Sequence, residues 1–125
     1  RAYEKECTQF LDRVYEQTIP VLFTQFSVHT IATVLSHRKK EPLFVDFASN
    51  LEGLHSLTIY STSLAEEKVI AQKCKEVKLD FDDSLQYWVA KTTGCEAIVS
   101  YDKDFDKTDL KRITPEQHLL HYSKK

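Results

Sequence analysis

The chain has 125 residues, 42% of them hydrophobic, a composition that excludes an intrinsically disordered protein and predicts one domain over 1–125. The formal net charge of −2 excludes a basic field over the whole surface, and the two glycines exclude a glycine-rich phosphate-binding loop. No apolar run approaches about 18 residues, so we expect no membrane span. Three cysteines without a CxxC pair indicate reduced thiols and a cytoplasmic protein.

The first part of the chain alternates helical and strand patterns. Apolar residues at helical spacing predict an amphipathic helix over 2–17, and a short buried strand follows at 21–23. Ser27 is the predicted cap of a second helix, which ends in a basic run at 37–40. We interpret that run as cations that complement a helix C-terminus, with a phosphate contact as the alternative.

The middle of the chain continues this alternation. Proline at the first helical position predicts that a third helix begins at 41–42, and a strand follows at 57–61. Ser63 and Glu66 form a capping box that opens a fourth helix. The apolar residues predicted to face inward are Leu43, Phe44, Phe47, Leu51 and Leu54 in the third helix, and Leu64, Val69, Ile70, Cys74 and Val77 in the fourth.

The segment 79–105 carries the densest pattern of the chain. Its acids at 80, 82 and 83 precede a helix predicted over 83–93, with Gly94 as the C-terminal cap. A compact strand at 97–99 then leads into a second acidic cluster, Asp102 and Asp104. A further strand near 112–113 and a capping box at 114–117 predict a last helix that carries Leu119, Leu120 and Tyr122.

The two acidic clusters are predicted to meet. The helix rises roughly 16 Å at 1.5 Å per residue, and the strand brings the chain back over roughly 20 Å at 3.3 Å per residue. Asp83 and Asp102 should therefore lie close together at the carboxyl end of the sheet, where open α/β folds place their ligands. Clustered carboxylates repel one another unless a cation joins them, and hard oxygen ligands favour Mg²⁺ or Mn²⁺.

A simpler interpretation of the same acids stays open. Aspartates at 80, 82 and 83 can cap a helix and complement its dipole, and Asp102 and Asp104 can be turn residues after a strand. Short strands that alternate with helices predict an α/β fold, with three α/β/α layers around a central, mainly parallel sheet.

Three stretches carry a resemblance to a known family. They are 80–94, with DFDDSLQY, Ala90, Lys91 and Gly94; 98–105, with IVSYDKDF; and 113–116, with ITPE. Together they resemble the PIN domain, specifically the VapC-like nucleases of toxin–antitoxin modules, over essentially the whole chain. The resemblance implies a parallel sheet flanked by helices and an acidic cluster that holds Mg²⁺ or Mn²⁺ for RNA hydrolysis.

The resemblance also assigns roles by position. Asp83 matches the third acid of the family and Asp102 the fourth, with Asp104 as a supporting acid; these three are the expected catalytic and metal-binding residues. The implied partners are an RNA substrate, a cognate antitoxin protein and a second copy of the chain in a homodimer.

Two family acids are not found. The first belongs to an N-terminal strand, and since no such motif appears after Arg1, we expect that strand to be missing from the given chain. The second is a glutamate early in the second helix, where Thr30 stands here. An active nuclease is therefore weighed against a catalytically degenerate PIN-like domain that binds RNA or a protein. A receiver-like or flavodoxin-like module would need an aspartate after the first strand, where Thr24 and Gln25 stand.

Overall fold

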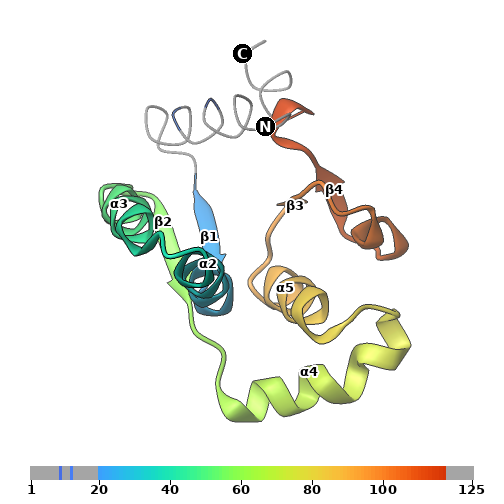
Figure 1. Cartoon of the computed structure of the whole chain (residues 1–125). Coiled ribbons are helices and arrows are strands. Elements are labelled where there is room, and N and C mark those ends of the chain that lie inside the picture. The colour runs from blue at the N-terminus through green and yellow to red at the C-terminus, as the bar shows by residue number, and fades with distance from the viewer. Residues whose placement is uncertain (1–8, 10–11, 13–19, 118–125) are drawn as a thin grey trace. The chain divides into compact units, whose positions relative to one another are not determined.

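The computed structural model of the chain describes residues 9, 12 and 20–117 (Figure 1). The chain divides into two compact units, one over Asp12–Thr62 and the other over Ser63–Lys125 with Arg1–Leu11. The expectation of a single domain over 1–125 stays a prediction. Of the predicted helix over 2–17, only Gln9 and Asp12 are described, and both are helical. The apolar residues at 119, 120 and 122 lie outside the described residues.

The unit Asp12–Thr62 contains two parallel strands joined by two helices. The elements are β1 (Val21–Thr24), α2 (Gln25–His37), α3 (Glu41–Glu52) and β2 (Leu57–Tyr60). The strands pair in parallel from Val21 opposite Leu57 to Thr24 opposite Tyr60. A parallel pair needs a crossover connection, and the two helices supply it. Pro42 lies in the first turn of α3, as predicted.

The cap of α2 corrects one prediction. Thr24, not Ser27, caps the helix, because β1 runs directly into α2 and leaves Thr24 in an extended conformation at the helix start. The hydroxyl oxygen of Thr24 accepts a hydrogen bond from the Ser27 backbone N–H at 3.1 Å. Ser27 therefore lies inside the first helical turn. Threonine and serine are both good caps, so the sequence alone did not separate them.

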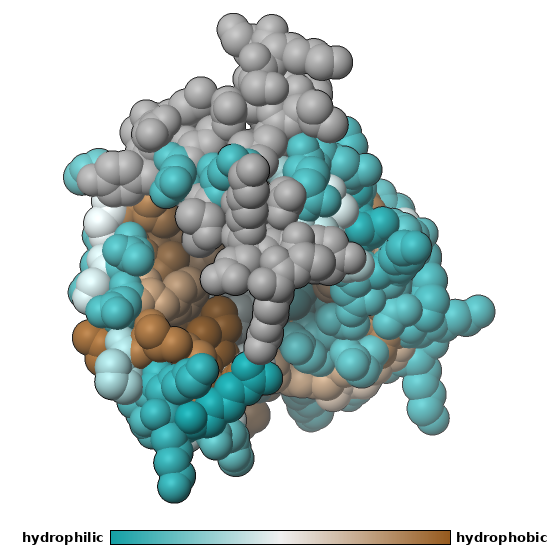
Figure 2. Space-filling model, turned by 45° about the horizontal axis from the view of Figure 1, so that its top comes forward, coloured by the Kyte–Doolittle hydropathy of each residue, from teal (hydrophilic) through white to brown (hydrophobic). Residues whose placement is uncertain are grey.

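Aromatic rings pack α3 onto β1. The ring centroid of Phe47 lies 6.4 Å from that of Phe23 on β1 and 6.3 Å from that of Phe44. Leu51 is buried, but Leu43 is half exposed, so its predicted inward position is wrong. Apolar surface is visible over this unit on the left of Figure 2. The exposed apolar side chains of its two helices are Val34, Leu43 and Val45.

The second unit is centred on the packing of two helices, α4 (Leu64–Val77) and α5 (Phe81–Thr92). The predicted capping box is present: the Ser63 hydroxyl accepts from the Glu66 N–H, and the Glu66 carboxylate accepts from the Ser63 N–H. Leu64 and Val69 are exposed, so their inward assignments are wrong; Leu64, at 84% exposure, is the first residue of the helix. The buried side chains of the two helices are Ile70, Ser84, Leu85, Val89 and Ala90.

A strand pair completes this unit. Gly94 ends α5 with φ +74°, and the Gly94 and Cys95 N–H groups donate to the carbonyls of Lys91 and Ala90, a Schellman motif. The strands β3 (Ala97–Val99) and β4 (Lys111–Ile113) pair in parallel. A 3₁₀ helix, η1 (Lys103–Lys107), lies in the connection between them, and its Phe105 side chain is buried.

The α/β class with parallel strands is confirmed, but the sheet differs from the expected one. Among the described residues the strands form two parallel pairs, β1–β2 in one compact unit and β3–β4 in the other. Each strand has only three or four residues. In the part of the chain described here, no helix is long and apolar enough to cross a membrane.

Candidate metal centre

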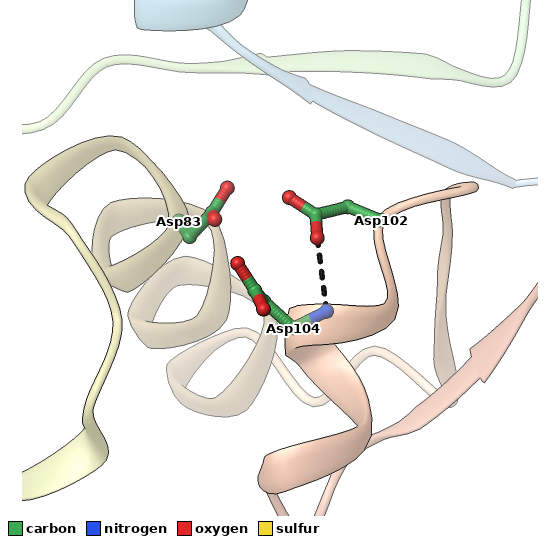
Figure 3. A group of neighbouring side chains, drawn as sticks. All are labelled: Asp83, Asp102 and Asp104. Carbon is green, nitrogen blue, oxygen red and sulfur yellow. Dashed lines mark hydrogen bonds between the residues drawn. The ribbon is translucent and has the colours of Figure 1, made fainter.

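Three carboxylates converge at the carboxyl end of β3. Asp83 lies in the first turn of α5, Asp102 follows β3, and Asp104 lies in η1. One carboxylate oxygen from each residue lies within 4.8 Å of those of the other two. Figure 3 shows the three side chains directed toward a common point. The structure thus brings together the three acids that sequence reasoning selected, from segments about twenty residues apart.

At the start of α5, the side chains of Asp80 and Asp82 accept local hydrogen bonds, whereas the side chain of Asp83 does not take part in them. Asp80 caps the helix, and its carboxylate accepts from the Asp83 N–H at 2.9 Å. Asp82 accepts from the Gln86 side-chain amide at 3.2 Å, one turn along the exposed face. The capping interpretation therefore holds for Asp80. Asp83 takes no part in that cap through its side chain, which is directed at the other two acids.

The second half of the cluster is shaped by a tight turn. The Ser100 N–H donates to the Ile113 carbonyl at 2.9 Å and extends the β3–β4 pair by one bond. The Ser100 hydroxyl then accepts from the Asp102 N–H, and the Asp102 carboxylate from the Asp104 N–H, both at 2.9 Å. The second bond is the dashed line in Figure 3. Asp102 is therefore a turn residue as well, but a carboxylate that caps with one oxygen keeps its other oxygen for a second partner.

Two basic side chains contact the same turn. The Lys107 ammonium lies 3.4 Å from an Asp104 carboxylate oxygen. Arg112, on β4, donates to both carboxylate oxygens of Asp106 and to the Ser100 carbonyl. Sequence reasoning did not select either residue. Ser100, two residues before Asp102, fits a known turn signal, but the pairing of Arg112 with Asp106 depends on the strand register and has no local signal.

The surroundings of Asp83 disfavour its charged form. The pKa of Asp83 is raised from its ordinary value to about 6, first by burial of the carboxyl and then by the negative charges of Asp80 and Asp102. Burial disfavours the charged form, and nearby like charges add to that cost. A bound cation would offset both effects, because an opposite charge nearby favours the ionised carboxylate.

The three acids fit a hard divalent cation. Oxygens that share one Mg²⁺ at about 2.0–2.1 Å lie at most about 4.2 Å apart. The present oxygens, all within 4.8 Å, would have to move closer together to share one ion. Asp102 and Asp104 are exposed and Asp83 is half buried, which leaves room for the water ligands that Mg²⁺ usually keeps.

Thr30 lies in the other compact unit. It is exposed in the second turn of α2, and its hydroxyl donates to the Phe26 carbonyl at 3.0 Å, within its own helix. The relation of Thr30 to the acidic cluster therefore stays a prediction from the resemblance.

Comparison with known proteins gives two matches. The sequence model described as "PIN domain" matches residues 3–111, a range that includes all three acids. Ribonuclease VapC1 of Aquifex aeolicus (strain VF5) is 26% identical over 117 residues, which cover 94% of this chain and 81% of that protein. No solved structure gives a significant match.

Proposed function

The chain belongs to the PIN domain family, and on that premise we propose that it is a metal-dependent endoribonuclease of the VapC-like toxin–antitoxin type. One observation carries the proposal: Asp83, Asp102 and Asp104 place carboxylate oxygens within 4.8 Å of one another. The similarity to a protein named as a ribonuclease supports RNA as the substrate.

The three carboxylates would hold Mg²⁺ or Mn²⁺. Such an ion supplies an activated water and stabilises the negative charge that develops on the phosphoryl group. Asp83 is half buried and Asp102 is held by the turn, so both are oriented before an ion binds. Lys107, beside Asp104, adds a positive charge at the exposed rim that favours the approach of a phosphodiester.

The proposal includes protein partners. We propose a cognate antitoxin and a homodimer, in the cytoplasm, from the family resemblance. The exposed apolar side chains Val34, Leu43 and Val45 support a protein contact on the helices α2 and α3, because a packed interface would cover them.

The alternative function is a catalytically degenerate PIN-like domain that binds RNA or a protein. Thr30 favours it: a hydroxyl that is hydrogen-bonded to its own helix cannot replace the charge of a glutamate. One carboxylate fewer weakens metal binding, since ligand charge is a main determinant of affinity.

The test is RNA cleavage by the full-length protein with Mn²⁺ or Mg²⁺ against a chelator. Asp83→Asn should lower the metal-dependent rate by at least about 100-fold, as expected for removal of a group that positions transition-state charge stabilisation. Asp82→Asn is the matched control, because Asp82 is an adjacent acid of the same helix that bonds Gln86 and not the cluster.

The outcomes separate the two functions. Cleavage that survives the chelator, or that is equally fast in Asp83→Asn, would contradict the proposed site. If the natural chain cleaves no RNA but Thr30→Glu does, the degenerate interpretation holds.

A further inference from the structure

Arg112 joins the two ends of the acidic turn. Its guanidinium donates from Nη1 to the Ser100 carbonyl at 3.0 Å. It also donates from Nε and Nη2 to the two carboxylate oxygens of Asp106, at 2.9 and 3.2 Å. Ser100 and Asp106 bracket Asp102 and Asp104 in sequence, so a single side chain on β4 fixes both sides of the segment that carries two of the three acids.

The geometry of this contact favours a rigid connection. A bidentate guanidinium–carboxylate pair holds its partner in orientation as well as in distance. The Arg112 side chain is only 14% exposed, so it is largely shielded from solvent, whereas the Asp106 side chain is 55% exposed to solvent. Lysine could keep the charge of Arg112 but not the planar fork or the three simultaneous bonds.

The positive charge of Arg112 also supports a role next to the acidic turn. The guanidinium is also attracted by the negative charge of Asp102. The guanidinium therefore acts on the metal-binding acids both through the backbone and through space.

We propose that Arg112 is a positioning residue for the metal centre, which holds Asp102 and Asp104 at the spacing that a divalent cation needs without itself contacting the ion. This inference rests on the proposed function. It assigns a role to a side chain outside the three acids, in the last strand that the structure describes.

The test is Mn²⁺ affinity of the full chain, measured from the electron paramagnetic resonance signal of free Mn²⁺ at a temperature where circular dichroism shows every variant folded. Arg112→Met should weaken the affinity about 10- to 100-fold, the range for groups that orient metal ligands. Asp106→Asn should weaken it less, because the bond to the Ser100 carbonyl remains. Arg112→Lys should fall between Arg112→Met and wild type.

A matched control separates positioning from general stabilisation. Lys91→Met removes another ion pair of the same unit, Lys91 with Asp109 at 3.0 Å, which does not touch the acidic turn. It should lower the melting temperature without changing the Mn²⁺ affinity. If Arg112→Met does not fold, Arg112→Lys and Asp106→Asn carry the same comparison.

The outcomes distinguish this inference from the function on which it rests. If wild type binds Mn²⁺, Asp83→Asn does not, and the Arg112 and Asp106 variants bind within twofold of wild type, the metal centre stands and the positioning role is wrong. If wild type binds no Mn²⁺, both are wrong. Weakened binding in the Arg112 variants beside unchanged binding in Lys91→Met supports the role.

Discussion

Two strand-to-helix junctions of this chain use the same backbone device with different chemistry. At the end of β1, Thr24 caps α2 by accepting from the Ser27 N–H. After β3, Asp102 caps η1 by accepting from the Asp104 N–H. Both strands are paired in parallel, so both junctions lie at the carboxyl end of a strand pair. The local folding problem, an orphan N–H at a helix start, is solved equally well by either side chain.

The two capping side chains differ in charge and in exposure. Thr24 is neutral and only 3% exposed, and the first turn of α2 carries no acid. Asp102 is exposed and charged, and it faces Asp83 and Asp104. A hydroxyl that caps a helix is neutral and has a single oxygen. A carboxylate that caps a helix keeps its negative charge and has a second oxygen that can bind a ligand. The charge of the capping residue, and not the junction itself, therefore distinguishes the edge that we propose as a metal-binding site.

The largest expected effect comes from removing the two caps in turn. Asp102→Ala should lower metal-dependent RNA cleavage at least about 100-fold, because it removes a ligand. Thr24→Ala should leave Mn²⁺ affinity unchanged and lower the free energy of unfolding by about 1–2 kcal/mol, as for a lost helix cap. RNA cleavage, Mn²⁺ titration and denaturant unfolding of both variants measure these effects. Equal loss of metal binding in both variants would contradict the division of roles.

The second prediction concerns pH. The pKa of Asp83 is about 6 in the folded, metal-free protein, so a proton competes with the cation below that pH. Mn²⁺ affinity should therefore fall about fivefold between pH 6 and pH 5, because the deprotonated fraction of Asp83 falls from about one half to about one tenth. Titration of Mn²⁺ at pH 7, 6 and 5 measures it. A pH-independent affinity in this range would remove Asp83 from the ligand set.

The metal-free protein provides the control for that prediction. Because the folded pKa of Asp83 exceeds its ordinary value of 3.8, this group stabilises the fold fully below about pH 3.8. That stabilisation is lost as the pH rises through about 6. With a chelator present, Asp83→Asn should thus be more stable than wild type at pH 7.5, and the difference should shrink toward pH 4. Thermal melts across this range give the comparison.

Features that depend on neighbours in sequence were predictable. The capping boxes at Ser63 and Thr114 need only residues three positions apart, and both are present. The approach of Asp83 to Asp102 followed from the lengths of one helix and one strand. In each case the interaction joins residues that are close in sequence, so the residue types and their spacing predict it directly.

Features that depend on register or on burial were not predictable. The pairing of Arg112 with Asp106 requires β4 to lie beside β3 in one particular alignment. Leu64 and Leu43 fit a helical stripe, yet both are exposed, because periodicity gives a face and not what covers it. For the same reason the alternation of strands and helices predicted parallel pairing but not its division into two pairs.

A third prediction concerns a negative charge added to α2, the helix that Thr24 caps. Thr30→Glu places a carboxylate at the position that the resemblance assigns to the family's second acid, and we expect Mn²⁺ affinity to rise by up to about tenfold, because ligand charge sets affinity. Thr33→Glu is the matched control: Thr33 is also exposed on α2, and its hydroxyl donates to the His29 carbonyl at 2.9 Å, as Thr30 does to Phe26. An equal gain in both variants would indicate general electrostatic attraction and not a fourth ligand.

The smallest expected effect concerns the cation already beside the acids. The Lys107 ammonium is 3.4 Å from an Asp104 oxygen, and both side chains are more than half exposed. A pair of this kind contributes up to about 1 kcal/mol. Since the ammonium competes with a metal ion for that oxygen, Lys107→Met should raise Mn²⁺ affinity about two- to fivefold at low salt, and the gain should shrink as salt screens the pair. Lys111→Met, an exposed lysine on β4, is the control. A weaker affinity in Lys107→Met would instead mean that the lysine orients Asp104 for the ion, as Arg112 is proposed to do for the turn.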